Sequence, residues 1–365
     1  MTEFQRQDSP PALDSPGALV HPIQLEIRDF ADYAAVIDAR SPREYQDDHV
    51  PGAINLPVVN DEQYAEVGTL HKESPHQAYI VGVRHSLRNI ADQIQPTLAL
   101  LPPKSRVLVY CFRGGKRSAL WADSLRTIGF TTDVLPGGWR AYRRWVRSSL
   151  EKLSPAFEYR VLTGSTGAGK TRLLSALHKA GEQVLDLEGL ASHRGSLIGA
   201  VPGVEQPPQK YFDSLLLDAM RRFSTERPVW IEAESKKVGA VQIPPALQET
   251  MHRSKSFELQ ASMAARILAW REDFAHFAAD PVSMVRMLEP LMPLIGKDEL
   301  AAWHLLAVEQ KVDALFERVM VKHYDPCYAR SIKRNYSGRA PERVLKLDRL
   351  DPEYLLSVAT DLRGQ

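Results

Sequence analysis

The clearest structural signal in this chain is the segment Val107-Leu108-Val109-Tyr110-Cys111-Phe112-Arg113-Gly114-Gly115-Lys116-Arg117-Ser118. An apolar β-rich run, a cysteine with glycines and basic residues, and a helical pattern predict a strand, a loop and a helix in that order. Such a turn directs the cysteine into backbone N–H groups at a helix N-terminus, where thiolate is favoured over thiol. We therefore expect Cys111 to be a reactive nucleophile. The alternative is a buried structural cysteine.

The composition is that of a soluble globular protein. The chain has 365 residues, 25% charged and 44% hydrophobic, with a formal net charge of +1. This length predicts two or three domains, and a nearly neutral chain meets nucleic acid only through a local basic patch. Two cysteines exclude a disulfide scaffold and most cysteine-based metal sites, and they fit a reducing compartment. Because we find neither a membrane-spanning segment nor a signal-peptide pattern, we expect a cytoplasmic protein without a membrane partner.

The first part of the chain predicts an α/β domain after a disordered lead-in. Residues 1–20 contain Ser-Pro segments that resist packing, so they are expected to be disordered. Residues 21–150 are expected to form a parallel-sheet domain, because buried strand patterns alternate with helical ones. The expected strands are 35–38, 107–110 and 132–135, and the expected helices are 118–128 and 139–150.

The second part predicts another parallel α/β domain followed by helices. Residues 156–245 are expected to form this domain, with strands at 159–163, 184–187 and 229–233. From 246 to 365 the pattern changes to long helical periods, so we expect a helical C-terminal region that packs on the second domain.

Landmarks on both sides of Cys111 resemble the rhodanese-like family. They are Asp38-Ala39-Arg40-Ser41-Pro42-Arg43-Glu44-Tyr45, His49-Val50-Pro51-Gly52-Ala53-Ile54-Asn55-Leu56-Pro57 and Gly137-Gly138-Trp139. The resemblance covers about residues 20–148 and implies a central parallel sheet with a cysteine that carries sulfur or a heavier chalcogen. We expect Asp38 and Arg40 to brace the fold as a buried pair.

The cysteine loop departs from the usual sulfur-transferring pattern. Those family members span six residues from cysteine to arginine, whereas Cys111 to Arg117 spans seven. A wider loop, formed here with Arg113, Gly114 and Gly115, surrounds a tetrahedral phosphorus group whose oxygens meet N–H donors and Arg117. Two interpretations stay open: attack of Cys111 on a phosphoester, or encounter with a chalcogen donor that carries phosphorus.

A second anion-binding motif opens the second domain. Gly164-Ser165-Thr166-Gly167-Ala168-Gly169-Lys170-Thr171 fits the eight-position phosphate-loop pattern and lies between a predicted strand and a predicted helix. The glycines let the backbone wrap phosphates, Lys170 neutralises their charge, and Thr171 reaches a magnesium ion. A nucleotide or another diphosphate-bearing substrate satisfies the same loop.

Further polar residues follow the predicted strands of this domain. Glu232 and Glu234 come after an apolar run and are candidate metal ligands, with surface carboxylates as the alternative. Asp186, His193 and Arg194 follow another strand and are candidate phosphate or substrate contacts, with capping or packing as the alternative.

The whole arrangement resembles the tRNA 2-selenouridine synthase family. The resemblance is carried by the Cys111 loop together with Asp186-Leu187-Glu188-Gly189-Leu190-Ala191-Ser192-His193-Arg194-Gly195-Ser196. It implies conversion of 2-thiouridine at the wobble position (U34) of tRNA to 2-selenouridine through an S-geranyl intermediate. It also implies selenophosphate and geranyl diphosphate as substrates, with an enzyme that supplies selenophosphate as a candidate partner. We expect no tightly bound cofactor, and Mg²⁺ at Thr171 is a candidate metal.

Two basic and aromatic clusters are candidate tRNA contacts. The helix after Trp139 carries Arg140, Arg143 and Arg144 with Tyr142 and Trp145 between them, and the second cluster contains Lys322, Arg330, Lys333 and Arg334 with several tyrosines. Such mixtures suit phosphate contact and base stacking, and an ordinary solvated helix face is the alternative.

Cys327 has no glycine-rich loop around it, so we expect it to be structural. The apolar stretch 284–295 is a candidate prenyl pocket, with ordinary core as the alternative.

Two other functions are compatible with parts of the sequence. A cysteine phosphatase fused to a kinase-like module fits the seven-residue loop, but Tyr110 stands where many such enzymes have histidine, and no general acid is evident. A non-catalytic nucleotide-gated regulator fits less well, because Cys111 and Arg117 are both intact.

Overall fold

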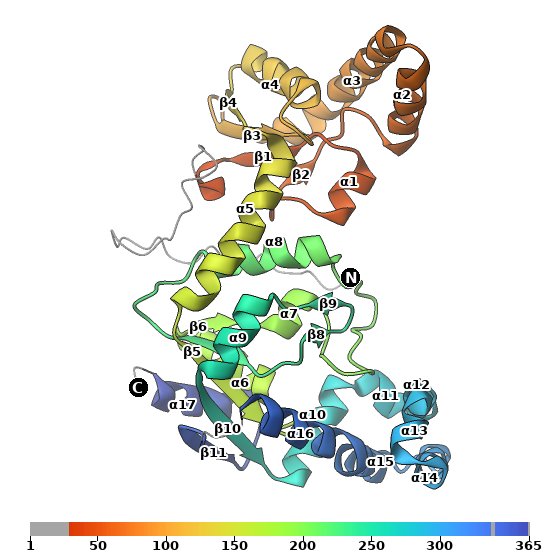
Figure 1. Ribbon diagram of the computed structural model, residues 1–365, viewed down its shortest axis with the longest axis vertical. Helices are drawn as coiled ribbons and strands as arrows, with labels where there is room; N and C mark the ends of the chain where they lie inside the picture. Colours follow the sequence, from red (N-terminus) through yellow and green to blue (C-terminus); the bar gives the residue numbers. More distant parts are fainter. Residues whose placement is uncertain (1–28, 337–339, 364–365) are drawn as a thin grey trace.

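The computed structural model describes residues 29–336 and 340–363. The expected lead-in 1–20 lies outside these residues. Two parallel sheets are joined by one long helix, and further helices cluster beside the second sheet (Figure 1). The α/β fold expected from the sequence is confirmed.

The first sheet has four parallel strands in the order β2-β1-β3-β4. The strands are β1 (Ala35–Asp38), β2 (Ile54–Asn55), β3 (Arg106–Tyr110) and β4 (Thr131–Val134). β1 is buried along its whole length, as the apolar run Ala-Val-Ile requires in a sheet covered on both faces. The helices of this unit are η2 (Phe30–Asp32), α1 (Pro42–Asp47), α2 (Asp61–Glu73), α3 (Pro75–Leu98) and α4 (Lys116–Ile128).

A buried ion pair fixes the end of β1, as the sequence predicted. Arg40 donates from Nη2 to Asp38 at 2.6 Å and to the carbonyl of Asp48 at 2.6 Å. Asp38 is fully buried and Arg40 is 1% exposed, so each buried charge is stabilised by its contact with the other and not by water.

The second sheet has five parallel strands in the order β11-β10-β5-β7-β6. The strands are β5 (Tyr159–Gly164), β6 (Gln183–Leu185), β7 (Val229–Glu232), β10 (Lys255–Ala261) and β11 (Arg343–Leu347), and a separate hairpin pairs β8 (Lys237–Val238) with β9 (Val241–Gln242). The strand expected over 184–187 ends earlier, because Asp186 accepts a hydrogen bond from the Gly189 N–H and caps a helix. β10 and β11 lie in the region expected to be helical, so this region also completes the sheet.

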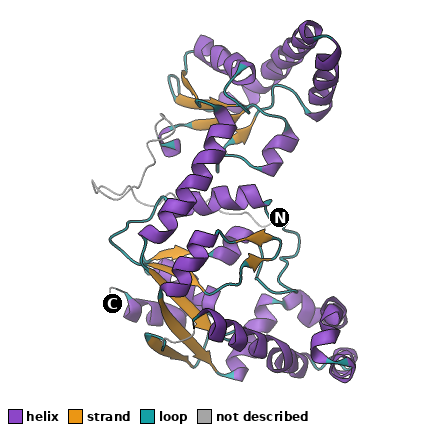
Figure 2. Cartoon of the chain, viewed as in Figure 1, coloured by secondary structure: helices purple, strands orange, loops and turns teal. Residues whose placement is uncertain are grey.

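The remaining helices cover the second sheet and extend beside it (Figure 2). Those close to the sheet are η3 (Ser154–Ala156), α6 (Lys170–Lys179), α7 (Leu187–Ala191), α8 (Gln209–Met220), α9 (Pro245–Arg253) and α17 (Pro352–Leu362). The C-terminal cluster comprises α10 (Met263–Asp273), α11 (Ala275–Ala279), α12 (Pro281–Leu288), η4 (Glu289–Leu291), α13 (Met292–Ile295), α14 (Lys297–Val308), α15 (Val312–Val319), the π-helix η5 (Met320–Tyr324) and α16 (Asp325–Asn335).

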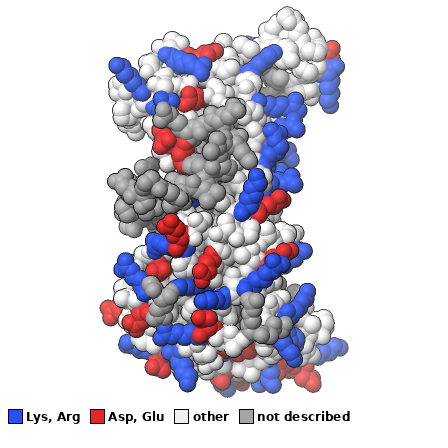
Figure 3. All heavy atoms as spheres, turned by 60° about the vertical axis from the view of Figure 1, so that its left-hand side comes forward, with Lys and Arg blue, Asp and Glu red and all other residues white. Residues whose placement is uncertain are grey.

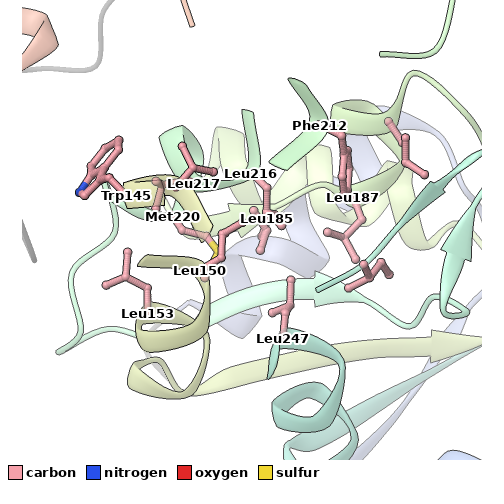
Figure 4. Packing of buried hydrophobic residues seen from close by; sticks show 14 of the residues in the cluster. Trp145, Leu150, Leu153, Leu185, Leu187, Phe212, Leu216, Leu217, Met220 and Leu247 are labelled. Carbon is pink, nitrogen blue, oxygen red and sulfur yellow. The ribbon is translucent and has the colours of Figure 1, made fainter. Parts of the chain in front are cut away.

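The helix α5 (Gly138–Leu153) joins the two sheets through a shared core. Its apolar face packs against α8, β6, α7 and α9, with Trp145, Leu150 and Leu153 among the contacting side chains (Figure 4). These residues recur at helical spacing, which explains why one face of α5 is buried.

Within the described parts of the chain, no helix has the length and apolar character needed to cross a bilayer.

Two candidate substrate sites

Cys111 lies at the carboxyl end of β3, where the chain turns into α4. Its sulfur is 3.3 Å from the Gly115 nitrogen, which donates to it, and 3.2 Å from the Ser118 hydroxyl. Burial of the thiol opposes ionisation, but hydrogen bonds from Ser118 and from the N–H groups of Arg113 and Gly115 lower the pKa of Cys111. The side chain is 3% exposed, so it forms the floor of the loop.

The turn at Gly137-Gly138-Trp139 supports this loop from behind. A Cβ atom on Gly138 would lie 2.2 Å from the Cys111 carbonyl oxygen and 2.5 Å from the Gly114 nitrogen, so only glycine fits. The Trp139 N–H donates to the Cys111 carbonyl at 2.8 Å, and its indole N–H donates to Asp48 at 2.8 Å. The loop shape is therefore fixed by the start of α5.

Arg117 lies in the first turn of α4 and is held by Glu44. Its two terminal nitrogens donate to the Glu44 carboxylate at 2.6 and 3.3 Å. Burial works against the charge, but Glu44 raises the pKa of Arg117. Glu44 is itself fixed by the capping box that it forms with Ser41 at the start of α1.

The phosphate loop connects β5 to α6, as its motif predicted. Lys170 donates from Nζ to the Gly164 carbonyl at 2.9 Å and lies 5.0 Å from the ring centroid of Tyr328. The Gly164 N–H donates to the Tyr328 hydroxyl at 2.6 Å. Arg266 donates to the Thr166 carbonyl at 2.8 Å, so residues far along the chain hold the first half of the loop.

Buried carboxylates gather beneath Thr171. Its hydroxyl lies 3.0 Å from Glu188 and 3.1 Å from Glu232, and one hydroxyl donates to only one of them. Burial and then mutual repulsion raise the pKa of Glu232 well above its usual value and that of Glu234 to about 8. The carboxyl groups of this cluster therefore hold their protons more strongly than exposed carboxyl groups do. Asp186 instead caps α7.

A cavity of about 380 Å³ adjoins the phosphate loop. It is lined by the loop with Lys170 and Thr171 and by Trp270, Phe274 and Tyr324 of the C-terminal helices. Arg194 also lines it, with its guanidinium 5.0 Å from the ring centroid of Phe274. His193 accepts a hydrogen bond from the Gly195 N–H, so it stabilises its own turn.

The arginine helix differs from expectation in its aromatic residues. Tyr142 and Trp145 are buried at 1% and 5% exposure, so the expectation that they stack on bases is wrong: they face the core. Arg140, Arg144 and Arg147 are exposed, whereas Arg143 donates to Asp213 of α8. Lys and Arg side chains gather along one edge of the upper half of the molecule (Figure 3).

The second basic cluster is divided between surface and cavity. Its cationic side chains are exposed: Lys322, Arg330, Lys333 and Arg334. Its tyrosines turn inward, and Tyr328 holds the phosphate loop. Cys327, expected to be structural, lines the cavity and accepts a hydrogen bond from Arg330 at 3.1 Å.

Sequence reasoning missed the aromatic lining of the cavity, because nothing local to Trp270 or Tyr328 indicates contact with a loop about 100 or more residues away.

Comparisons with known proteins match both α/β units of the chain. The family model of the tRNA 2-selenouridine synthase AAA domain matches residues 157–286, and that of the rhodanese-like domain matches residues 25–144. The tRNA 2-selenouridine synthase of Nitrosomonas europaea is 32% identical over 263 residues, which are 71% of this chain and 67% of that protein. The protein of the same name from Marinobacter nauticus is 34% identical over 250 residues, 67% of this chain and 66% of that one. The one from Hahella chejuensis is 28% identical over 336 residues, 84% of this chain and 87% of that one. The chain belongs to the tRNA 2-selenouridine synthase family.

Proposed function

We propose that this protein is a tRNA-modifying transferase that replaces the sulfur of wobble 2-thiouridine with selenium. The observation that carries the proposal is the presence in one chain of two different anion-binding loops, one with a cysteine and one with a lysine. Membership of a family whose relatives are named tRNA 2-selenouridine synthase supports tRNA as the substrate. Such a reaction needs one site that activates sulfur and another that delivers selenium.

Sulfur activation is assigned to the phosphate loop. The thiouridine sulfur forms a bond to C1 of geranyl diphosphate while the C1–O bond breaks and diphosphate leaves. Lys170 and the loop N–H groups stabilise the charge that develops on the leaving diphosphate. Alkylation is useful because a thiol leaves C2 of the base more readily than the unmodified sulfur does.

The cavity beside the loop is suited to the prenyl tail. Trp270 lies 5.3 Å from Phe274 and 5.7 Å from Tyr324 between ring centroids, so three rings form one apolar wall. The stretch 284–295, the earlier candidate for this pocket, does not line the cavity, and its Met284 and Val285 lie in the buried cluster to which the three rings also belong. The aromatic wall also suits the partial positive charge that develops on an allylic carbon as its bond to oxygen breaks.

The carboxylates beneath Thr171 suit a magnesium ion shared with the substrate. Mg²⁺ prefers oxygen ligands and is commonly held by one or two carboxylates together with substrate phosphates. Thr171, Glu188 and Glu232 supply such oxygens. Within the described residues, no group of three or more acidic, histidine or cysteine side chains is arranged to hold a metal alone, so the diphosphate is needed to complete the set.

Selenium delivery is assigned to the Cys111 loop. Selenophosphate carries phosphate oxygens that suit the loop N–H groups and Arg117. Selenium bonds to C2 of the geranylated base, and geranylthiol leaves.

We expect the tRNA to lie against exposed basic side chains, among them Arg140 and Arg144, and Lys322, Arg330, Lys333 and Arg334 of the second cluster.

The test is mass spectrometry of nucleosides from 2-thiouridine tRNA incubated with the purified protein. Geranyl diphosphate alone is expected to give the S-geranyl nucleoside, and both substrates together 2-selenouridine. Lys170→Ala is expected to abolish geranylation, whereas Cys111→Ala blocks selenation alone. Unchanged tRNA with Cys111-dependent hydrolysis of a phosphoester would instead support a phosphatase.

A further inference from the structure

We propose that Cys111 attacks the phosphorus of selenophosphate rather than its selenium, which makes the Cys111 loop a phosphoryl-transfer site. This inference rests on the proposed function, because it takes selenophosphate as the donor. The Cys111 sulfur forms a bond to phosphorus while the P–Se bond breaks and its electron pair leaves with selenium as hydroselenide. Water then hydrolyses the S-phosphocysteine, releasing phosphate and a proton and restoring the thiolate.

Electron balance favours phosphorus as the point of attack. Selenium in selenophosphate is already fully reduced, so transferring it to a thiolate as a perselenide requires phosphorus(V) to take up two electrons and leave as phosphite, which is an unfavourable reduction. Attack at phosphorus changes no oxidation state. The released hydroselenide then bonds to C2 of the S-geranylated base and expels geranylthiol, which also leaves every oxidation state unchanged.

The width of the loop fits a phosphoryl group. Seven residues run from Cys111 to Arg117, and Gly114 adopts a positive φ of 70° that turns the backbone around the sulfur. The Gly115 N–H already donates to the sulfur at 3.3 Å, so the donors of the loop converge where a phosphoryl group bonded to that sulfur would lie.

Arg117 is oriented for the equatorial oxygens of a phosphoryl group. Glu44 engages both terminal nitrogens, with distances of 2.6 and 3.3 Å, and fixes the guanidinium plane. A guanidinium has five N–H donors, so three remain for phosphoryl oxygens. Charge on those oxygens is stabilised by a cation that needs no rearrangement during the reaction.

Ser118 is placed to assist the second half of the reaction. Its hydroxyl lies 3.2 Å from the Cys111 sulfur and 3.0 Å from the Gly115 carbonyl, so it can turn from that carbonyl to the sulfur. When water attacks S-phosphocysteine, the sulfur leaves as a thiolate and gains a hydrogen bond from Ser118. Loss of this hydroxyl therefore slows hydrolysis more than formation of the phosphocysteine.

Tyr110 and Glu44, two ionisable side chains beside this loop, are both engaged in other contacts, which is consistent with this leaving group. Tyr110, beside the nucleophile, is fully buried and accepts a hydrogen bond from the Val50 N–H at 3.1 Å. Glu44, the acidic residue bonded to Arg117, has both oxygens engaged by that guanidinium. An alkoxide needs protonation to leave, whereas hydroselenide is the anion of a much stronger acid and leaves without it.

The test uses the full-length protein with selenophosphate, without tRNA, and intact-mass analysis after an acid quench at successive times. We expect a phosphoryl adduct on Cys111, which persists roughly tenfold longer in Ser118→Ala because a hydrogen bond to the leaving thiolate is lost. Ser124→Ala is the matched control, since its hydroxyl donates to the Leu120 carbonyl at 2.9 Å on the same helix. Cys111→Ser is expected to give no adduct.

The outcomes separate this inference from the proposed function. A selenium adduct on Cys111, or selenouridine formation with no phosphoryl adduct even in Ser118→Ala, overturns the inference and leaves the function intact. If 2-thiouridine tRNA is not converted under any substrate combination, the proposed function fails, whatever adduct forms. Equal adduct lifetimes in Ser118→Ala and Ser124→Ala would overturn the role given to Ser118.

Discussion

Replacing Ser118 by alanine should raise the pH at which Cys111 ionises. Four donors stabilise the thiolate against burial: the Ser118 hydroxyl and the backbone N–H groups of Arg113, Gly115 and Ser118. A hydrogen bond to a charged group contributes about 1.5–3 kcal/mol, and about 1.4 kcal/mol corresponds to one pH unit. Because the backbone donors remain, we take the lower end and expect the titration midpoint to rise by about one pH unit.

Thiolate absorbance in the ultraviolet measures this midpoint. The chain has two cysteines, so a Cys327→Ala background leaves Cys111 as its single thiol. In the wild type, the titration midpoint of Cys111 should lie below the ordinary thiol value of 9.0. In Ser118→Ala the midpoint should be higher than in the wild type, and in Ser124→Ala it should equal that of the wild type. A midpoint unaffected by Ser118→Ala would refute the reasoning, because the 3.2 Å contact would then contribute nothing to the thiolate.

Alkylation by iodoacetamide gives a second readout with a different magnitude. At a pH below the midpoints of both proteins, raising the midpoint of Cys111 by one pH unit lowers the fraction of thiolate about tenfold. The more basic thiolate is also more nucleophilic, by roughly threefold for a Brønsted coefficient of about 0.4–0.5. The observed rate should therefore fall only about three- to fourfold. A fall of tenfold or more would indicate that the variant also changes access to the sulfur.

Three further predictions concern the cavity, the interface between the two units and the arginine helix. Ala269 lines the cavity, so Ala269→Leu narrows it. Equilibrium binding of geranyl diphosphate should weaken about tenfold, whereas binding of inorganic diphosphate should be unchanged. Equal weakening of both ligands would contradict the assignment of the cavity to the prenyl tail. Burial raises the pKa of Asp48 from 3.8 to about 6, so its neutral form stabilises the fold below pH 4 and this contribution is lost as the pH rises to about 6. Asp48→Asn should therefore gain about 2 kcal/mol of unfolding free energy relative to wild type between pH 4 and 6.5 in urea titrations, and a constant difference would contradict the assignment. Arg144→Ala should reduce the salt dependence of tRNA affinity by about one released ion. Arg143→Ala should instead lower the midpoint of unfolding, because the contact of Arg143 with α8 is lost. The reverse pattern would contradict the placement of these two side chains.

Local chemistry explains which parts were predictable from the sequence. β1 and β5 are short apolar runs next to turn residues, and both anion loops are carried by consecutive residues whose glycines and cations define them. The sequence of β10, Lys-Ser-Phe-Glu-Leu-Gln-Ala, alternates as a strand does, but it was missed because it is short and lies among helical patterns. Its pairing with β5 is a long-range contact, which no local pattern reports.

The aromatic residues of α5 show a different limit. Tyr142, Trp145 and Val146 share the spacing of a buried helical stripe with Leu150 and Leu153, and the interpretation as a stacking surface gave more weight to the arginines between them. Periodicity alone would have placed these rings in the core. Tyr328 is the opposite case, because its contact with Gly164 joins residues 164 positions apart and leaves no periodic signal.

The shared core has a consequence for how two reactions use one nucleotide. A single buried cluster runs from Tyr33 in the first unit to Met251 in the second, with α5 at its centre, so the two loops belong to one packed body (Figure 1). Domains joined by a large apolar interface do not move freely against one another. Under the proposed function, a nucleoside that is S-geranylated at the phosphate loop must therefore travel to the Cys111 loop for selenation. The exposed residues Arg140, Arg144 and Arg147 follow α5 between the two units, where they can hold the tRNA backbone while its wobble base changes site.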